Sequence, residues 1–378
     1  MSRHLVIVGA GTAALSCAAK LRTLNTDIAI TIIGDEPCAP YQRPPLSKAY
    51  LTGDLPLARL ALRPAQWYAD NQIRLRLNTC VVALDCAAHT LTLADGQSLT
   101  YDALLLATGA CAKHLPAEVF DQGKVLRSIA DADQLAASMQ PGQQVLVLGG
   151  GYVGLEFAAS ARKKALAVSL VEAAPRILNR VAAAPTADYF RALHQGQGVR
   201  IFEGVSVTAF TPQDGKTLVT LSDGQSLSVD WVVVGIGATP NDQLARAAGI
   251  ACDDGILIDA AGRTSEARVY AAGDCARTAG QARIESVQNA IEQGEAVAYS
   301  LLNEPVPLRK TPWFWSDQYH AKLQIAGLNT GYDRVEVKSG TREGAQSVWY
   351  YQGQRLLAVD AINDPVTYMT VRRQLDTK

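Results

Sequence analysis

Two segments of the chain have the residue types and spacing that bind a dinucleotide. They read GxGxxA at Gly9, Gly11 and Ala14, and GxGxxG at Gly149, Gly151 and Gly154. In such a loop the first glycine permits a tight turn, the second lets the backbone approach a pyrophosphate, and the small third residue lets the helix pack closely on the strand. The amides that open the helix then face the phosphate charge. Because both patterns follow an apolar run and precede a helical pattern, we expect two dinucleotide sites.

Acidic residues follow both patterns where a nucleotide contact is expected. Asp35, with Glu36 beside it, closes the apolar run after the first pattern, and Glu172 closes the run after the second. A carboxylate at this place accepts hydrogen bonds from ribose hydroxyls and repels a 2′-phosphate, so Glu172 favours NADH over NADPH. Gly273-Asp274 ends a further strand-like run, which puts a carboxylate beside the pyrophosphate and sugar chain of a nucleotide. The alternative reading is that Glu172 caps a strand and Asp274 caps a loop.

The elements that position these residues repeat along the chain. Apolar runs that end in glycine, typical of parallel strands covered on both faces, lie at residues 4–9, 103–109, 144–149 and 231–237. Each copy also contains an Asp-Gly pair between alternating runs, at Asp95-Gly96 and Asp223-Gly224, which predicts a hairpin. After Trp313 the composition becomes aromatic and alternating. We expect an α/β chain with two Rossmann-like dinucleotide-binding domains and a C-terminal α+β domain.

The cysteines give no sign of thiol or metal chemistry. They are Cys17, Cys38, Cys80, Cys86, Cys111, Cys252 and Cys275. None are spaced as CxxC, and none have a histidine nearby at zinc-finger spacing, so neither a dithiol redox pair nor a metal site is expected.

Charge and hydropathy exclude other classes. A formal net charge of −1 over 378 residues lacks the excess of Lys and Arg that nucleic-acid binding requires. No run approaches the ~20 apolar residues that cross a bilayer. We expect a cytoplasmic protein that binds neither nucleic acid nor membrane.

The whole chain resembles the ferredoxin reductase branch of the two-dinucleotide flavoproteins. That branch includes the oxygenase-coupled ferredoxin, rubredoxin and putidaredoxin reductases and, more distantly, apoptosis-inducing factor. The matching stretches are PYQRPPLSK at 40–48, ATGA at 107–110, LRS at 126–128, GGGYVGLE at 149–156, VGIGATPN at 234–241, YAAGDCA at 270–276, ESVQNA at 285–290 and WFWSDQ at 313–318. They follow the family's order from end to end, so together they are far more specific than any one of them.

The resemblance implies a glutathione-reductase-like arrangement with tightly but non-covalently bound FAD. The residues it assigns to FAD are Gly9, Gly11, Ala14, Asp35 or Glu36, Arg43, Lys48, Val82 through its backbone, Ala107, Thr108, Gly109, Lys113, Gly273, Asp274, Val287 and Trp315. The other cofactor contacts that it implies are Gly149, Gly151, Tyr152, Val153, Gly154, Glu156, Glu172 and Gly237, with Glu172 expected at the ribose of NADH. Lys48 and Glu156 are expected to meet near flavin N5 and Trp315 to lie against the flavin, which makes these three the expected catalytic residues. The alternatives to these roles are that Arg43 belongs only to a rigid turn and that Trp315 is only a core residue.

The function implied is that of an NADH-dependent ferredoxin reductase. A hydride passes from NADH to FAD, and single electrons then pass to a small acidic [2Fe–2S] ferredoxin, or to a rubredoxin, that feeds an oxygenase or P450 system. The alternatives are a thiol-dependent NADH oxidase or disulfide reductase, for which Cys38 would be the candidate thiol, and a redox-sensing flavoprotein of the apoptosis-inducing-factor type. A monomer or weak homodimer is expected.

Two departures from the family concern contacts. Lys113 stands where an arginine often contacts the FAD pyrophosphate, and His320 replaces a common acidic residue in the expected carrier-docking region. The sequence places basic residues around Trp315, namely Arg309, Lys310, Arg334 and Lys338. We expect them to form a basic rim that docks an acidic carrier. The expected domains are 1–113 with 244–312 for FAD, 114–243 for NAD, and 313–378 at the C-terminus.

Overall fold

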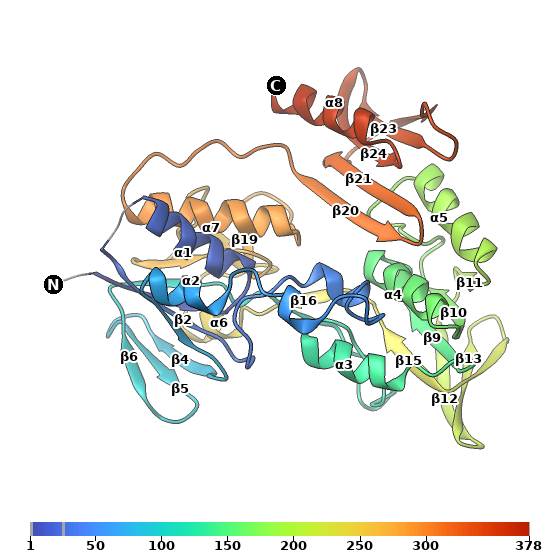
Figure 1. Cartoon of the computed structure of the whole chain (residues 1–378), viewed down its shortest axis with the longest axis horizontal. Helices are drawn as coiled ribbons and strands as arrows, with labels where there is room; N and C mark the ends of the chain where they lie inside the picture. Colours follow the sequence, from blue (N-terminus) through green and yellow to red (C-terminus); the bar gives the residue numbers. More distant parts are fainter. Residues whose placement is uncertain (1–2, 25–26, 378) are drawn as a thin grey trace. The chain divides into compact units, whose positions relative to one another are not determined.

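The computed structural model describes residues 3–24 and 27–377, which form two compact units (Figure 1). The first unit consists of Met1–Gln42, Ala58–Cys111 and Thr239–Arg309. The second consists of Arg43–Leu57, Ala112–Ala238 and Lys310–Lys378. The short segment from Arg43 to Leu57 therefore belongs with the second unit, although it is flanked on both sides by the first.

A five-stranded parallel sheet organises the first unit. Its strands, in spatial order, are β18 (Val269–Ala271), β7 (Ala103–Leu106), β1 (His4–Val8), β2 (Ala29–Ile33) and β3 (Ile73–Arg76). Leu5 on the central strand pairs in register with Ile30 on one side and Ala103 on the other. The apolar runs read from the sequence are thus buried strands covered on both faces, as predicted.

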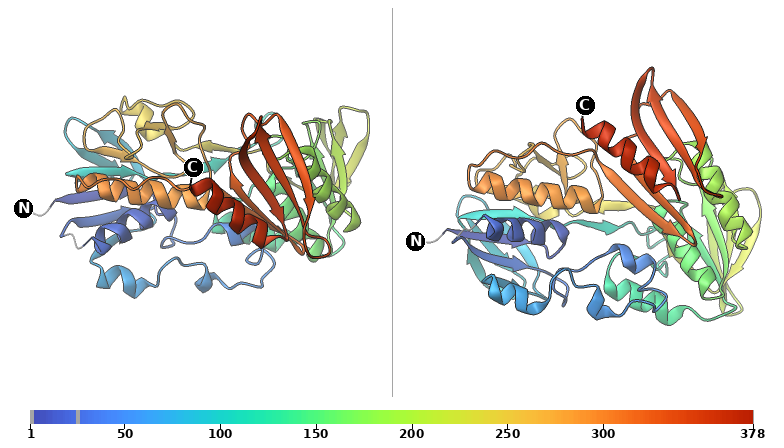
Figure 2. Two further views of the ribbon diagram at one scale, coloured as in Figure 1. Left: turned by 90° about the horizontal axis from the view of Figure 1, so that it is seen from above. Right: turned by 45° about the horizontal axis from the view of Figure 1, so that its top comes forward.

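Helices α1 (Thr12–Thr23) and α7 (Val287–Leu301) lie side by side in the first unit (Figure 2). Their close approach depends on Gly294, where a Cβ would lie 2.4 Å from the carbonyl oxygen of Ala13. Ser286 caps α7, because its hydroxyl accepts a hydrogen bond from the amide of Asn289. The helix therefore begins at Val287, as the sequence predicts.

The remaining elements of the first unit are short. They are the antiparallel strands β4 (Val81–Asp85), β5 (Thr90–Leu93) and β6 (Ser98–Thr100), the paired strands β17 (Ile256–Ile258) and β19 (Ala276–Thr278), and the helices α2 (Ala65–Asp70) and α6 (Gln243–Ala247). The hairpin from β5 to β6 turns at Gly96, whose φ is +83°. The predicted Asp-Gly turn is confirmed.

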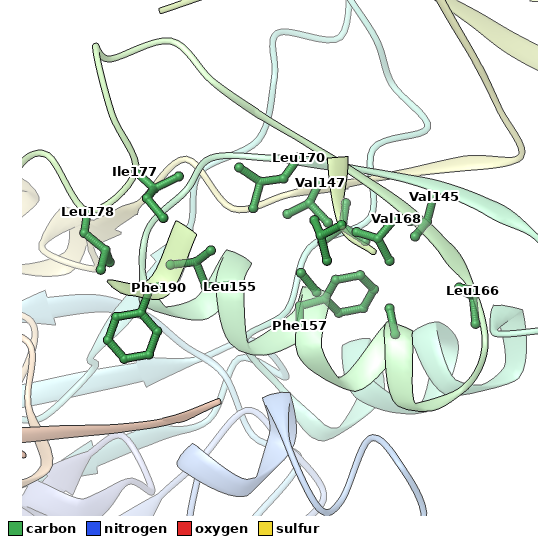
Figure 3. Packing of buried hydrophobic residues seen from close by; sticks show 14 of the residues in the cluster. Val145, Val147, Leu155, Phe157, Leu166, Val168, Leu170, Ile177, Leu178 and Phe190 are labelled. Carbon is green, nitrogen blue, oxygen red and sulfur yellow. The ribbon is translucent and has the colours of Figure 1, made fainter. Parts of the chain in front are cut away.

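A second parallel sheet organises the second unit. Its order is β11 (Arg200–Glu203), β10 (Ala167–Glu172), β9 (Gln144–Leu148) and β15 (Trp231–Val234). Helix α4 (Tyr152–Lys163) places Leu155 and Phe157 against Val147 and Val168 in the main core (Figure 3). The same unit contains the antiparallel strands β12 (Val207–Gln213), β13 (Lys216–Leu221) and β14 (Ser226–Val229), the helices α3 (Ile129–Ser138) and α5 (Ala184–Gly196), and the 3₁₀ turn Pro44–Ser47. The predicted turn at Gly224 is confirmed.

The C-terminal part of the second unit is an antiparallel sheet with one helix, as predicted. Its order is β20 (Trp313–Gln318), β21 (Ala321–Gly327), β24 (Arg355–Ile362), β23 (Gln346–Gln352) and β22 (Arg334–Ser339), followed by α8 (Pro365–Asp376). One face of this sheet packs on α8 through Ala326, Val359 and Tyr368. From the opposite face, Leu323 and Ile362 join the core that contains α4 and α5.

Two short strands, β8 (Ala110–Ala112) and β16 (Ala238–Pro240), pair with each other where the chain passes between the units. Across residues 3–24 and 27–377, no helix has both the length and the apolar character that crossing a membrane requires.

Candidate functional site

The first glycine loop has the geometry of a phosphate cradle. Gly9 has φ +110°, and a Cβ there would lie 2.1 Å from the carbonyl oxygen of Ala107, so only glycine fits. At Gly11, the N-cap of α1, an added Cβ would meet nothing within 4 Å. The first amides of α1 have no partner within the helix, and a glycine cap has no side chain to accept from them. The loop therefore combines open space at Gly11 with helix amides that need an acceptor, which fits the pyrophosphate of a dinucleotide.

The third position of the first loop is Ala14, which is fully buried in α1. A different close contact in the first unit involves Gly294 of α7, which approaches the Ala13 carbonyl oxygen of α1. Gly294 was not predicted from the sequence. A glycine inside a helical pattern, where alanine is preferred, is the signal that could have found it.

The residues expected around the adenosine lie at strand ends of the first unit. Asp35 is exposed just after β2, whereas the Glu36 carboxylate accepts a hydrogen bond from the Tyr41 hydroxyl at 2.7 Å. The register of β4 with β5 shifts between Val81 and Ala83, so Val82 lies in a bulge and is 56% exposed. A bulge leaves the extra residue outside the strand pairing, which fits a backbone contact from Val82 to adenine. Asp35 suits the ribose better than Glu36.

The loops after β7 and β18 are anchored from within the first unit. Thr108 donates to the Asn241 carbonyl at 2.6 Å, and the Asn241 amide donates back to the Thr108 carbonyl at 2.9 Å. This exchange fixes the loop of Ala107, Thr108 and Gly109. The Gly273 amide donates to Gln293 on α7 at 2.7 Å, which fixes the turn before Asp274.

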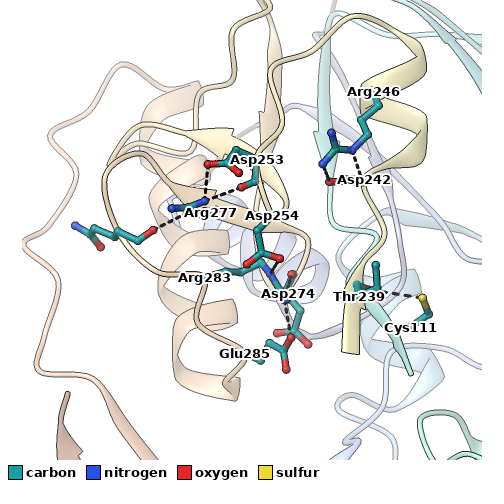
Figure 4. Close-up of polar contacts among 11 residues, drawn as sticks. Cys111, Thr239, Asp242, Arg246, Asp253, Asp254, Asp274, Arg277, Arg283 and Glu285 are labelled. Carbon is teal, nitrogen blue, oxygen red and sulfur yellow. Dashed lines mark hydrogen bonds and ion pairs between the residues drawn. The ribbon is translucent and has the colours of Figure 1, made fainter. Parts of the chain in front are cut away.

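Arg283 is a further anchor that was not predicted from the sequence. Its guanidinium donates to the Asp274 carbonyl at 3.0 Å and to the Glu285 carboxylate at 2.6 Å (Figure 4). It thereby ties the loop after β18 to the residues that precede Val287 at the start of α7. Its position two residues before the ESVQNA stretch is the only signal that could have found it.

The second glycine loop repeats this geometry in the second unit. Gly149 has φ +100° and would bring a Cβ to 2.4 Å from the Gly235 carbonyl oxygen, and Gly154 would bring one to 2.1 Å from the Gly149 carbonyl oxygen. At Gly151, the N-cap of α4, an added Cβ would meet nothing within 4 Å. Val153 in the first turn is 48% exposed. The open face of this loop fits a second pyrophosphate.

Tyr152, which opens α4, turns inward instead. Its ring centroid lies 4.9 Å from that of Phe314 on β20, and burial raises the pKa of its hydroxyl. In the structure it therefore braces α4 against the C-terminal sheet.

Backbone amides hold the Glu172 side chain at the end of β10. Its carboxylate accepts hydrogen bonds from the amides of Gly150 at 2.7 Å and Ala174 at 2.8 Å. Each carboxylate oxygen has a further lone pair for a ribose hydroxyl. Close to the unit's boundary, the Lys113 amide donates to the Gly237 carbonyl at 2.9 Å, so these two predicted contact residues adjoin.

The structure brings Lys48 and Glu156 together, as the resemblance implied. The Lys48 ammonium lies 2.6 Å from Oε2 of Glu156, a residue of α4 that is only 5% exposed. The Ser47 hydroxyl donates to the same carboxylate oxygen at 2.5 Å. Arg43, four residues before Ser47, donates to the Arg127 carbonyl at 2.8 Å. The motif that begins at Arg43 thus places the Lys48 cation against the nearly buried Glu156 carboxylate, and its contact with FAD stays a prediction.

Trp315 is half-buried on β20, with its ring centroid 5.5 Å from that of Trp313. Both rings line a groove of about 680 Å³ on the C-terminal domain. Polar groups of both charges share this groove: Asp317, His320, Lys322, Arg342 and Glu343. The expected contact of Trp315 with the flavin stays a prediction.

The predicted basic rim around Trp315 is wrong for two of its members. Arg334 and Lys338 lie on β22, at the opposite edge of the sheet from β20. Four inter-strand steps separate these edges, roughly 19 Å. Both side chains also form ion pairs with Glu336. Sequence proximity could not reveal that the intervening strands enter the sheet between them. The roles of Arg309 and Lys310 stay a prediction.

The other chemistry read from the sequence can be compared with the side-chain positions. Burial raises the pKa of the thiols of Cys17, Cys86, Cys252 and Cys275, which disfavours the reactive thiolate. Within residues 3–24 and 27–377, no group of three or more His, Cys, Asp or Glu side chains is placed to hold a metal ion.

Two glycine loops, each opening a helix at the end of a parallel strand, define a class of protein that holds two dinucleotides. Residues 3–294 match the family described as pyridine nucleotide-disulphide oxidoreductase, and residues 313–378 match the family described as reductase C-terminal. The chain belongs to the pyridine nucleotide-disulphide oxidoreductase family. It is therefore an oxidoreductase, and FAD and a pyridine nucleotide are its cofactors.

Similar proteins cover nearly the whole chain. Rhodocoxin reductase of Rhodococcus erythropolis is 41% identical over 99% of this chain and 90% of its own length. Putidaredoxin reductase of Pseudomonas putida is 40% identical over 97% of this chain and 90% of its own length. The crystal structure of a covalent putidaredoxin reductase–putidaredoxin complex contains a chain that superposes with a TM-score of 0.95 and 38% identity, covering 99% of this chain and 93% of that one. The family resemblance drawn from the motifs is confirmed.

Proposed function

We propose that this protein is an NADH-dependent ferredoxin reductase that delivers single electrons to a small acidic [2Fe–2S] ferredoxin, or to a rubredoxin, in an oxygenase or P450 system. The observation that carries the proposal is the end-to-end similarity to rhodocoxin and putidaredoxin reductases, which includes the C-terminal domain with Trp315. Bound FAD accepts electrons in pairs from NADH and releases them singly, so one protein links a two-electron donor to a one-electron carrier.

The proposal assigns FAD to the loops of the first unit and NADH to the glycine loop of the second. For FAD the contacts are the loop at Gly9 and Gly11, the carboxylates of Asp35 and Asp274, and the amides that open α7. For NADH the contacts are the loop at Gly149 and Gly151 and the carboxylate of Glu172. We also propose domains at residues 1–113 with 244–312, 114–243 and 313–378. Arg43–Leu57, which packs with the second compact unit, is counted with the FAD domain because its motif is assigned to FAD.

The role proposed for the chain's own residues is to bind and orient. The glycine loops fix the two pyrophosphates, and positioning of this kind supplies much of the rate in a transfer between bound cofactors. Lys48 holds a positive charge in a defined place, because its ammonium pairs with Glu156 and donates to the Pro44 carbonyl. A cation there would favour the negative charge of a reduced flavin.

A cytoplasmic location forms part of the proposal. The seven cysteines, all within the described residues, form no disulfide. Cysteines in this number without disulfides are typical of a reducing compartment.

The experiment is to reduce a [2Fe–2S] ferredoxin and a rubredoxin with NADH and the purified yellow protein. Visible absorbance of each carrier reports its reduction, and ferricyanide serves as a carrier-independent acceptor. Carrier reduction at a rate comparable to ferricyanide reduction is expected. Ferricyanide reduction with neither carrier reduced would contradict the proposal.

The thiol-dependent alternative is tested by Cys38→Ser. Cys38 is half-buried in the first unit, in the loop after β2. We expect NADH-to-ferricyanide and NADH-to-ferredoxin rates within about twofold of wild type, because no step of the proposal uses a thiolate. A loss of both rates with FAD still bound would place the protein among the thiol-dependent enzymes.

A further inference from the structure

Behind the Lys48–Glu156 pair lies a line of buried polar side chains that the proposed function leaves unexplained. Ser316 and Gln318 on β20 and His194 on α5 each have an exposed fraction of 0%. Buried polar groups of this kind are costly unless they are hydrogen-bonded to one another. All of these residues belong to the second unit.

Hydrogen-bond distances connect these side chains into one continuous line. The Ser316 hydroxyl lies 2.6 Å from Oε1 of Glu156, and Nε2 of Gln318 lies 3.1 Å from that hydroxyl. Oε1 of Gln318 is 2.8 Å from Nε2 of His194. Nδ1 of His194 lies 3.5 Å from the Tyr319 hydroxyl, a longer contact at the far end.

The chemistry of the groups fixes the direction of every hydrogen bond. A carboxylate only accepts, so Ser316 uses its single proton on Glu156 and must accept from Gln318. The Gln318 carbonyl oxygen then faces His194, which must carry its proton on Nε2. Nδ1 is left as an acceptor toward Tyr319. Every donor in the line therefore turns toward the carboxylate of Glu156.

We infer that Ser316, Gln318 and His194 are positioning residues that hold the Glu156 carboxylate, and through it the Lys48 ammonium, in place for the flavin reaction. Oε1 of Glu156 accepts the hydrogen bond from Ser316 at the end of this line, which leaves Oε2 to accept from Ser47 and Lys48. The carboxylate is thus hydrogen-bonded at both oxygens and cannot rotate without breaking a hydrogen bond. Its role in the reaction rests on the proposed function.

Helix α5 offers a matched control. Thr186, one of its first residues, is also 0% exposed and donates to Asp360 on β24 at 2.7 Å. Thr186 and His194 thus both tie α5 to the C-terminal sheet by a buried hydrogen bond. Only His194 belongs to the line that ends at Glu156.

The first experiment reads the tautomer of His194 by long-range ¹H–¹⁵N NMR on protein labelled at its five histidines. The His194 signal is assigned by its loss in His194→Gln. A neutral ring protonated at Nε2 is expected in the wild type. A ring protonated at Nδ1 would overturn the inference, whether or not the protein reduces ferredoxin.

The second experiment measures NADH-driven flavin reduction by stopped flow. His194→Met fills the space without a donor, whereas His194→Gln places an N–H where Nε2 lies. We expect His194→Met to lower the limiting rate about 5- to 10-fold, the worth of one buried hydrogen bond, with the NADH Kd within about twofold of wild type. His194→Gln should recover the rate to within about twofold, and Thr186→Val should leave it unchanged.

Equal losses in His194→Met and Thr186→Val would show a general structural effect and overturn the inference, as would equal rates in the Met and Gln variants. If His194→Met fails to fold, Ser316→Ala cuts the same line by removing one atom and is judged by the same rate and Kd. A wild type whose flavin is not reduced by NADH would instead contradict the proposed function, and the tautomer measurement would still decide the hydrogen-bond line.

Discussion

Glu172 shows how a single carboxylate can serve both the fold and the choice of cofactor. Its two oxygens accept backbone amides, one from Gly150 in the second glycine loop and one from Ala174 just after β10. This anchoring removes side-chain freedom that would otherwise be lost on binding. It also holds the negative charge that we expect to repel a 2′-phosphate.

We therefore expect wild-type protein to prefer NADH strongly, and Glu172→Gln to reduce that preference. The amide keeps the size of the side chain and one acceptor oxygen, but loses the charge. A charged hydrogen bond contributes about 1.5–3 kcal/mol, so the ratio of kcat/KM for NADH to that for NADPH should fall at least about tenfold. The measurement uses ferricyanide as acceptor with each nucleotide.

Glu203 provides the control for this prediction. It pairs in register with Glu172 on the adjacent strand, but its carboxylate faces Arg191 and the Ile177 amide. Glu203→Gln should leave the cofactor ratio unchanged. If both variants change the ratio alike, the assignment of Glu172 is wrong.

The sequence predicted individual residues best where the backbone dictates their type. Gly9, Gly149 and Gly154 were found because their neighbours allow no Cβ. Ser316 and Arg283 were not found, because a serine or an arginine is common on any surface. Only the tertiary contacts with Glu156 and Asp274 set these two apart.

At the scale of elements, the loop from β9 to α4 separates two kinds of glycine. A Cβ added at Gly151 would meet open space. A Cβ added at Gly154 would lie so close to the Gly149 carbonyl oxygen that the backbone would have to move. The fold therefore requires Gly154, whereas we predict that Gly151 is needed to admit a ligand.

This distinction predicts opposite outcomes for two alanine substitutions. Gly151→Ala should keep the melting temperature, because its φ of −77° suits any residue, but should raise KM for NADH about tenfold or more by filling the path of the pyrophosphate. Gly154→Ala should lower the stability by about 2 kcal/mol or more, since a Cβ forces α4 away from β9. Thermal unfolding and steady-state kinetics on both variants check this, and a destabilised Gly151→Ala with unchanged KM would contradict it.

Strand β20 contributes side chains both to the groove and to the buried hydrogen-bonded line. Trp313, Trp315 and Asp317 line the exposed groove, while Ser316 and Gln318 point into the buried line that reaches Glu156. The alternation of a strand explains this split. The sequence motif WFWSDQ predicted an aromatic contact but could not show which alternate residues face the interior.

The buried His194 predicts a pH dependence of stability. Burial lowers its pKa from 6.5 to about 4, against the opposing effect of the Gln318 hydrogen bond. Between these values the unfolded chain binds a proton that the folded chain does not. The contribution of His194 is thus full above pH 6.5 and is lost as the pH falls through 4, by roughly 3 kcal/mol in total.

His194→Gln should remove this dependence. Relative to wild type, the variant should gain roughly 2 kcal/mol between pH 7.5 and pH 4.5. Asp360, whose pKa burial raises to about 6, contributes in the opposite direction, but it is common to both proteins and cancels in the difference. Urea unfolding followed by tryptophan fluorescence is suitable, because Trp231, Trp313, Trp315 and Trp349 belong to the second unit. A difference that does not vary with pH would show that His194 is not buried as described.

For the whole molecule, charge decides little at long range. A net charge of −1 neither attracts nor repels an acidic carrier strongly, so steering must come from local patches. At physiological ionic strength the Debye length is about 8 Å. Charges roughly 19 Å from β20, as on β22, are therefore screened from a carrier that docks at Trp315.

Charge reversal at two places on the C-terminal sheet should then give different results. Lys322→Glu/Arg342→Glu reverses both cations of the groove that Trp315 lines and should raise KM for an acidic ferredoxin about tenfold at 0.1 M salt, because like charges then meet at the contact. The increase should shrink at 0.5 M salt through screening. Arg334→Glu/Lys338→Glu introduces the same change of charge on the far edge strand and should leave KM within about twofold. Ferricyanide reduction, which needs no docking, should be the same in both variants and in wild type. If the far-edge variant raises KM as much as the groove variant, the carrier does not dock at the groove beside Trp315.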